Sequence, residues 1–214
     1  MSSGSDGAPD TPPQILECGD GRTIAYHRLA GKSPGVMFLT GFKSDMTGGK
    51  ALALEAHCRA QGRAFLRFDY TGHGQSSGVF EEGSIGAWAA DAVTALDELA
   101  VGEQVLVGSS MGGWIMLLTA LARKSRIRGL LGLAAAPDFT RDLMWNTFTE
   151  DQRQQLDRDG HVDLPNDYDD QEPYRISKPL IDDGWNQLLL DDPIELGIPV
   201  RLIHGLLDKD VPWK

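Results

Sequence analysis

Short apolar runs recur along the chain and alternate with stretches whose apolar residues follow helical spacing. The runs contain little polar alternation, as strands buried on both faces should. They lie at residues 36–39, 64–68, 105–107, 130–133 and 200–203. Helical spacing is found at residues 51–60, 84–99 and 112–123. Repeated strand, helix, strand order implies right-handed crossovers. The pattern therefore predicts an α/β protein whose mostly parallel sheet is flanked by helices.

Two short strand-like segments precede this alternation, at residues 14–17 and 23–28. The turn Gly19-Asp20-Gly21 between them is typical of a hairpin. Residues 1–13 are rich in Ser, Gly and Pro and lack the patterns of a signal or transit peptide. We expect a disordered leader at residues 1–13 and one domain at residues 14–214.

Residues 137–193 break the alternation and are longer than a crossover needs. Thr149 and Gln152 have the spacing of a capping box, and Ser177-Lys178-Pro179 begins a second predicted helix. An acidic loop is expected at residues 167–173. We interpret the insertion as a cap over the active site, although packing against the surface alone remains an alternative. Its apolar side chains fit either an acyl pocket or ordinary core.

Charge, hydropathy and cysteine content indicate which partners and which cellular compartment to expect. The formal net charge of -11 and the absence of a basic cluster argue against nucleic acid as a partner. No apolar run is long enough to span a bilayer, so we expect no stable membrane insertion. The two cysteines, Cys18 and Cys58, form neither a metal-type nor a redox-type pair. Together with the leader, they predict a cytoplasmic protein.

The sequence Gly108-Ser109-Ser110-Met111-Gly112 follows an apolar run and opens a helical stretch. This context indicates a nucleophile elbow, in which a sharp turn between strand and helix presents the central hydroxyl. The glycines leave room for close chain packing. Ser110 is therefore the candidate nucleophile.

Such a serine needs donors for the developing oxyanion and an acid that orients its base. The backbone N–H groups of Met111 and Phe42 are the predicted oxyanion hole, since Phe42 follows the strand at residues 36–39. Asp208 follows a buried strand and is the predicted acid. Asp210 and Asp138 are its alternatives.

A catalytic base is harder to assign. In the chain order Ser, Asp, His, the base must follow Asp208, but residues 209–214 contain no histidine. His73 lies near the expected catalytic edge, in a glycine turn that favours a structural role. His204 precedes a glycine at a strand end, which is typical of a packing residue.

Three segments carry a resemblance to a known family: residues 68–78, residues 108–114, and residues 204–208 with Val211-Pro212-Trp213. Together they resemble the alpha/beta-hydrolase superfamily, and within it the mitochondrial palmitoyl-protein thioesterases that also hydrolyse acyl glucuronides, with their bacterial relatives. The resemblance implies that Ser110 is the nucleophile, that Asp208 is the acid and that the turn at residues 69–76 is structural. The family's catalytic histidine has no counterpart here.

By this resemblance, the last strand, the histidine loop and a closing helix would follow Lys214, over roughly 25 to 30 residues. The strand at residues 200–203 would then be an apolar sheet edge, which natural proteins seldom leave bare. We therefore expect a truncated member of a competent family.

The sequence thus predicts a serine hydrolase that cleaves thioester or carboxylic ester bonds through an acyl-serine intermediate. Its substrates would be small-molecule or acylated-protein esters, with no metal or organic cofactor. The 214-residue chain should be nearly inactive, because removing the base of a comparable triad costs about 10⁶-fold in turnover. A general carboxylesterase and a non-catalytic binding module are the alternatives; a dehalogenase is disfavoured because its nucleophile is normally aspartate.

Overall fold

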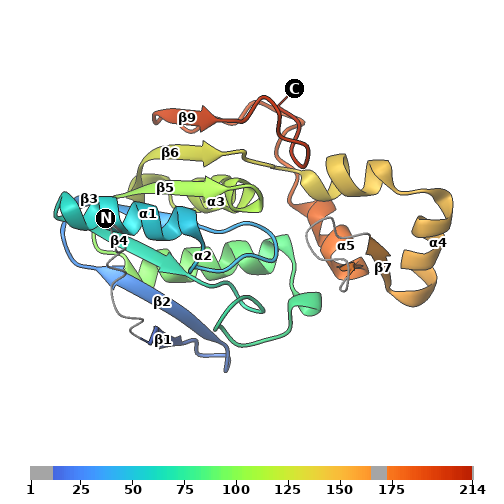
Figure 1. Ribbon diagram of the computed structural model, residues 1–214, viewed down its shortest axis with the longest axis horizontal. Coiled ribbons are helices and arrows are strands. Elements are labelled where there is room, and N and C mark those ends of the chain that lie inside the picture. Colours follow the sequence, from blue (N-terminus) through green and yellow to red (C-terminus); the bar gives the residue numbers. More distant parts are fainter. Residues whose placement is uncertain (1–11, 165–172, 214) are drawn as a thin grey trace, which may run out of the picture.

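The computed structural model describes residues 12–164 and 173–213, so the predicted leader and most of the acidic loop lie outside the described residues. A seven-stranded sheet has the order β1-β2-β4-β3-β5-β6-β9 (Figure 1). Its strands are β1 (Gln14–Glu17), β2 (Thr23–Leu29), β3 (Lys32–Leu39), β4 (Arg63–Phe68), β5 (Gln104–Ser109), β6 (Ile127–Leu133) and β9 (Val200–Ile203). β1 pairs with β2, and β2 with β4, in antiparallel fashion. All other pairings in this sheet are parallel, which confirms the predicted fold class.

Helices cover both faces of this sheet. On one face α2 (Ile85–Leu99) and α3 (Met111–Ala122) bury Trp88 and Trp114 in the main core with Met37. On the other face α1 (Gly49–Ala60) packs over a smaller cluster that includes Phe38. Met37 and Phe38 face opposite sides because successive strand residues alternate. This two-sided burial explains why the central strands are continuously apolar.

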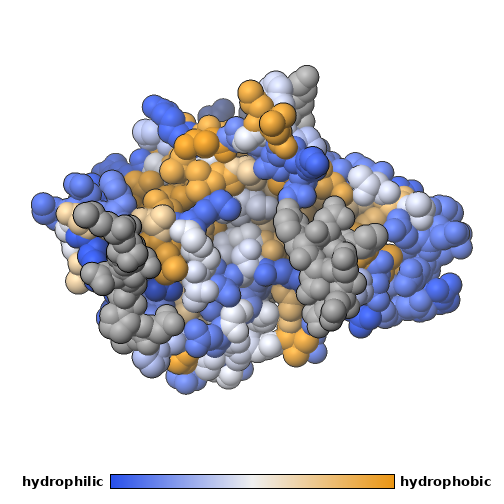
Figure 2. Space-filling model, in the orientation of Figure 1, coloured by the Kyte–Doolittle hydropathy of each residue, from blue (hydrophilic) through white to orange (hydrophobic). Residues whose placement is uncertain are grey.

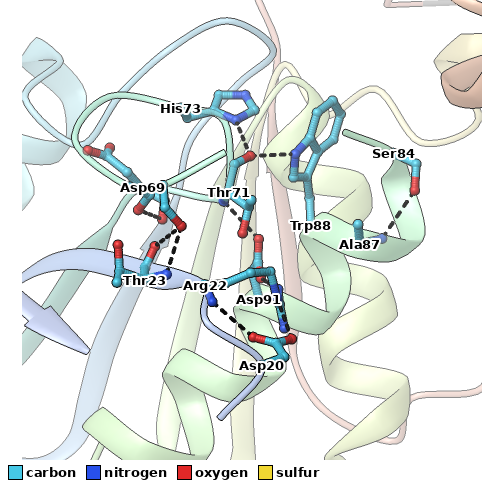
Figure 3. Close-up of polar contacts among 12 residues, drawn as sticks. Asp20, Arg22, Thr23, Asp69, Thr71, His73, Ser84, Ala87, Trp88 and Asp91 are labelled. Atoms are coloured by element: carbon cyan, nitrogen blue, oxygen red, sulfur yellow. Dashed lines mark hydrogen bonds and ion pairs between the residues drawn. The ribbon is translucent and has the colours of Figure 1, made fainter. Parts of the chain in front are cut away.

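The N-caps of three helices are the residues that the sequence predicted. The hydroxyl of Ser84 accepts a hydrogen bond from Ala87 N–H at 3.3 Å, which confirms Ser84 as the N-cap of α2 (Figure 3). In α4 (Glu150–Asp159), Thr149 and Gln152 exchange both bonds of a capping box. Ser177 caps α5 (Lys178–Asn186), whose first turn contains a proline.

Several elements lie between β6 and β9, in the segment interpreted as a cap. Besides α4 and α5 they are a π-helix at Thr140–Met144, a 3₁₀ turn at Trp145–Thr147, and the strands β7 (His161–Leu164) and β8 (Tyr174–Ser177). β7 and β8 pair as a separate antiparallel sheet that the sequence reading did not predict. Figure 1 shows this segment projecting beyond one end of the main sheet.

The strand β9 forms one edge of the main sheet. Its residues Leu202 and Ile203 are 71% and 60% exposed. Figure 2 shows an apolar area beside β6 and β9. A bare apolar edge of this kind is able to pair with another chain segment. Within the described part of the chain, no helix is both long and apolar enough to cross a membrane.

Candidate active site

Ser110 occupies a strained turn between β5 and α3. Its backbone has φ 53° and ψ -122°, a conformation that residues with a side chain rarely adopt. The end of β6 fixes the turn, since Ser110 N–H donates to Leu133 O at 3.0 Å and Ala136 N–H donates to Ser110 O at 3.1 Å. Ser110 itself is partly exposed. This is the backbone geometry of a nucleophile elbow.

Two glycines allow the strand and the helix to meet at this turn. A Cβ atom on Gly108 would lie 2.3 Å from Gly112 O, and one on Gly112 would lie 2.1 Å from Leu39 O. Any larger residue would force the backbones apart. The glycines of the motif therefore bring α3 against β3 as well as against β5.

The residues after β3 pass directly beside Ser110. A Cβ atom on Gly41 would lie 3.5 Å from Ser110 Cβ, which is ordinary van der Waals contact. Phe42 follows, and Ser44 N–H donates to Gly41 O at 3.1 Å to close a turn. Met111 is the first residue of α3, and the first N–H groups of a helix have no acceptor inside the helix. The predicted oxyanion donors thus lie on the two segments that flank Ser110.

The ring of Phe42 joins the core to the cap segment. It packs edge-on against Phe80 at a centroid distance of 4.9 Å and against Phe139 at 5.7 Å. Tyr174 of β8 lies 6.4 Å away. Edge-to-face aromatic pairs contribute about 0.5–1.5 kcal/mol beyond their buried area. The segment predicted as a cap therefore contacts the residue predicted to bind the oxyanion.

Asp208 follows β9 and is held by its own turn. Its Oδ1 accepts from the backbone N–H of Asp210 at 3.0 Å and of Val211 at 2.9 Å. Its Oδ2 lies 3.9 Å from His204 Nε2, beyond hydrogen-bond distance. His204 Nε2 lies 2.7 Å from Val211 O, and because a carbonyl only accepts, Nε2 carries the proton. His204 thus stabilises the loop that carries Asp208, in keeping with the structural role expected of a histidine at a strand end.

Asp138, an alternative acid, accepts hydrogen bonds from backbone N–H groups of the cap segment. Its fully buried carboxylate accepts from Leu189 N–H and Leu190 N–H, each at 2.9 Å. Arg141 lies 3.4 Å from its Oδ2. This carboxylate therefore joins the start of the cap segment to residues near its end.

His73 is enclosed in the turn after β4 (Figure 3). Its ring lies 5.0 Å from both Phe80 and Trp88, and burial lowers the pKa of the imidazole to about 4, so it is neutral near pH 7. Its Nδ1 faces Thr71 O at 3.4 Å, and Trp88 Nε1 donates to the same oxygen at 3.0 Å. Thr71 N–H donates to the buried Asp91 at 2.8 Å. These contacts give His73 a structural environment.

In the described ranges, no group of three or more His, Cys, Asp or Glu side chains has an arrangement that could hold a metal ion.

Comparison with known proteins settles the family. Residues 40–212 match the family model described as the alpha/beta hydrolase family. The chain belongs to this family. It is 40% identical over 190 residues to the human mitochondrial palmitoyl-protein thioesterase ABHD10, covering 89% of this chain and 62% of that protein. The chain thus spans less than two thirds of this relative's length.

Solved structures agree with the match to this hydrolase family. Mouse alpha/beta hydrolase domain-containing protein 10 superposes with a TM-score of 0.86 at 38% identity, covering 95% of this chain and 81% of that chain. A putative hydrolase from Agrobacterium vitis gives 0.88 at 34% identity, with 95% and 83% covered. The resemblance inferred from the three sequence segments is therefore confirmed.

The predicted cytoplasmic location is wrong. The curated relatives from cattle, rat and human are named as mitochondrial proteins. The prediction rested on the lack of a recognised targeting pattern and on cysteine use. Neither property identifies a compartment, because targeting segments are read by receptors and leave no mark on the folded domain.

Proposed function

We propose that this hydrolase cleaves thioester or carboxylic ester bonds through an acyl-serine intermediate on Ser110. The observation that carries the proposal is the strained backbone of Ser110 beside Gly41, which presents a hydroxyl at the start of a helix. The thioesterase names of the relatives support thioesters as one substrate class. Small-molecule esters and acylated proteins are both candidates.

The proposed reaction has two steps. Ser110 Oγ attacks the carbonyl carbon while a base removes its proton, and the carbonyl oxygen gains negative charge. The N–H groups of Met111 and Phe42 donate to that oxygen. The bond to the thiol or alcohol then breaks, and the leaving group takes the proton from the base. Water attacks the acyl-serine by the same route and releases the carboxylic acid.

Asp208 is the proposed acid that orients the base. The base would be a histidine later in chain order than Asp208, and residues 209–214 contain none. His73 is buried in its turn, and His204 uses its Nε2 on Val211 O. We therefore expect the 214 residues alone to hydrolyse esters very slowly.

A fluorophosphonate probe tests the nucleophile. The protein translated from its coding region beyond Lys214 should be labelled at Ser110, and Ser110→Ala should abolish the label. Ser109→Ala is the matched control, because Ser109 is the preceding residue and is buried in β5. A stop codon directly after Lys214 would contradict the proposed position of the base. A Ser110 that stays unlabelled in the longer protein would favour a non-catalytic binding module.

Substrate competition distinguishes the remaining alternatives. Palmitoyl thioesters, short-chain esters and acyl glucuronides would be compared by kcat/KM in the same longer protein without the probe. Preference for the long acyl thioester supports a palmitoyl-protein thioesterase. A preference for short-chain esters would instead identify a general carboxylesterase.

A further inference from the structure

The loop at residues 40–46, which carries Phe42, has a backbone conformation that contacts from other segments must stabilise. Lys43 adopts a positive φ of 53°, which costs about 1–3 kcal/mol for a residue with a side chain and persists only when its surroundings hold it. A backbone donor in an oxyanion hole must lie about 2.7–3.1 Å from the oxyanion. Displacement by about 1 Å costs on the order of 10²-fold in rate. The contacts that hold this loop are therefore relevant to catalysis.

The first end of the loop is contacted by Tyr70. Tyr70 is fully buried, and its hydroxyl donates to Thr40 O at 3.5 Å. Thr40 O also faces α3, since a Cβ on Gly112 would lie 2.5 Å from it. The peptide that leads into Gly41 is thus held between a tyrosine hydroxyl and the helix of the elbow.

The other end of the loop is contacted by Asp69. Asp69 is 1% exposed, and its Oδ1 accepts from Met46 N–H at 2.7 Å. Arg67 Nη1 donates to Met46 O at 3.1 Å, so both polar groups of the Met46 backbone are satisfied from β4 and the residue that follows it. Met46 is itself fully buried. The loop therefore has a second fixed point three residues beyond Lys43.

The glycine turn after β4 fixes the carboxylate in turn. Asp69 Oδ2 accepts from Gln75 N–H at 2.9 Å. Gly74 has φ 47°, and a Cβ there would lie 2.1 Å from Asp69 Oδ2. The turn thus has to have glycine at this position for the carboxylate to lie beneath it. Asp69 and His73, which both belong to this segment, are labelled in Figure 3.

We infer that Asp69 and Tyr70 are positioning residues, which hold the loop at residues 40–46 at its two ends and so aim the Phe42 N–H at the oxyanion. The inference rests on the proposed function, in which that N–H is a donor. It assigns a task to the motif at residues 68–78, whose role in the resemblance was only structural. Parallel pairing of β3 with β4 brings the two strand ends together and makes this possible.

Site-resolved amide hydrogen exchange, followed by NMR, tests the inference without requiring catalysis. The reporters are Ser44 N–H and Met46 N–H, each measured relative to the core amides of β5. In Tyr70→Phe, both should exchange about threefold to tenfold faster than in the wild type, as expected for one neutral hydrogen bond. In Asp69→Asn the exchange rate of Ser44 N–H, relative to the β5 amides, should rise by about tenfold or more, because a charge-assisted hydrogen bond is lost.

Two matched variants control for general loosening of the fold. Tyr26→Phe removes the hydroxyl of another buried tyrosine, on β2, which β4 separates from β3. Asp91→Asn alters a buried carboxylate that accepts from Thr71 rather than from the loop. Both should leave the loop-to-β5 ratio unchanged. An unchanged ratio in Tyr70→Phe and Asp69→Asn, or an equal rise in the controls, would overturn the inference.

Kinetics of the longer protein, measured without the probe, supply the catalytic readout. Tyr70→Phe should lower kcat about threefold to tenfold and leave KM within about twofold, since the donor acts in the transition state. A change confined to KM would count against positioning. If Ser110 fails to react with the probe, the proposed function fails, whereas the exchange result still decides whether the loop is held as inferred.

Discussion

The buried carboxylate of Asp138 accepts a hydrogen bond from the backbone N–H of Leu189, 51 residues later in the chain. Leu190 N–H donates to the same carboxylate. Ala136, two residues before Asp138, donates its N–H to Ser110 O. One short segment therefore binds both the elbow and the far end of the cap segment.

Asp138→Ala should lower the free energy of unfolding by about 2–4 kcal/mol, because it removes the buried acceptor of two backbone N–H groups and one of the carboxylates that Arg141 contacts. Thermal unfolding followed by circular dichroism measures the effect, at about 2–4 °C per kcal/mol for a chain of this length. Asp142→Ala is the control, since Asp142 pairs with the same arginine but is 39% exposed. Equal melting temperatures for the two variants would show that the Asp138 contacts contribute little.

Gly112→Ala should destabilise the protein by about 3 kcal/mol or more, because its Cβ would lie 2.1 Å from the backbone oxygen Leu39 O. Gly49→Ala is the matched change in α1, where no atom lies within 4 Å of an added Cβ. That variant should be more stable than the wild type by about 0.5–1 kcal/mol, since alanine loses less conformational entropy in a helix. Urea unfolding of both variants measures the contrast, and an unaffected Gly112→Ala would contradict the close packing of the elbow.

Ser110→Gly should be more stable than Ser110→Ala by about 1 kcal/mol. Alanine keeps the strain of a side chain at φ 53°, whereas glycine adopts this conformation freely and its larger entropy loss offsets only part of the gain. Neither variant should react with a fluorophosphonate. Chemical denaturation of the two proteins side by side gives the difference, and the reverse order of stability would mean that the turn is not strained.

Acidification should destabilise the fold through His73. The unfolded imidazole takes up a proton near its ordinary pKa of 6.5, whereas burial lowers the folded pKa to about 4. The unfolded state therefore binds more protons between these values, and stability falls as the pH drops from about 6.5 to about 4, by up to about 3 kcal/mol. Urea unfolding at several pH values measures this slope.

The comparison variant for that slope is His73→Phe, which keeps an aromatic ring in the same enclosure. Burial raises the pKa of Asp69 and of Asp91, so both carboxylates oppose the histidine by taking up protons in the folded state as the pH falls. They are present in both proteins, so the difference between the two curves isolates His73. Parallel curves for the wild type and the variant would show that the imidazole does not titrate as described.

Much of the main sheet could be predicted because its signals are local. An apolar run marks a strand buried on both faces, and the capping residues Ser84, Thr149 and Ser177 each act within three residues of a helix start. The elbow around Ser110 is local in the same sense. Its glycines and serine are consecutive, and a strand and a helix flank them directly.

Contacts between distant segments were not predictable in this way. The pairing of β7 with β8 joins two strands that are each only four residues long. The link from Asp138 to Leu189 and that from Tyr70 to Thr40 cross 51 and 30 positions. Neither has a spacing pattern, because the partners meet only after the sheet and the cap segment have formed.

The order of apolar and polar residues by itself determined which segments become strands and helices and which serine follows a strand at a sharp turn, since these follow from period and from glycine. The tertiary structure alone decided which carboxylate accepts hydrogen bonds from the cap segment and which histidine is buried. It also decided which contacts reach the loop that places Phe42 near Ser110. The physical reason is that hydrogen bonding and burial depend on groups brought together across the fold. A carboxylate has the same letter in the sequence whether backbone amides or water surround it.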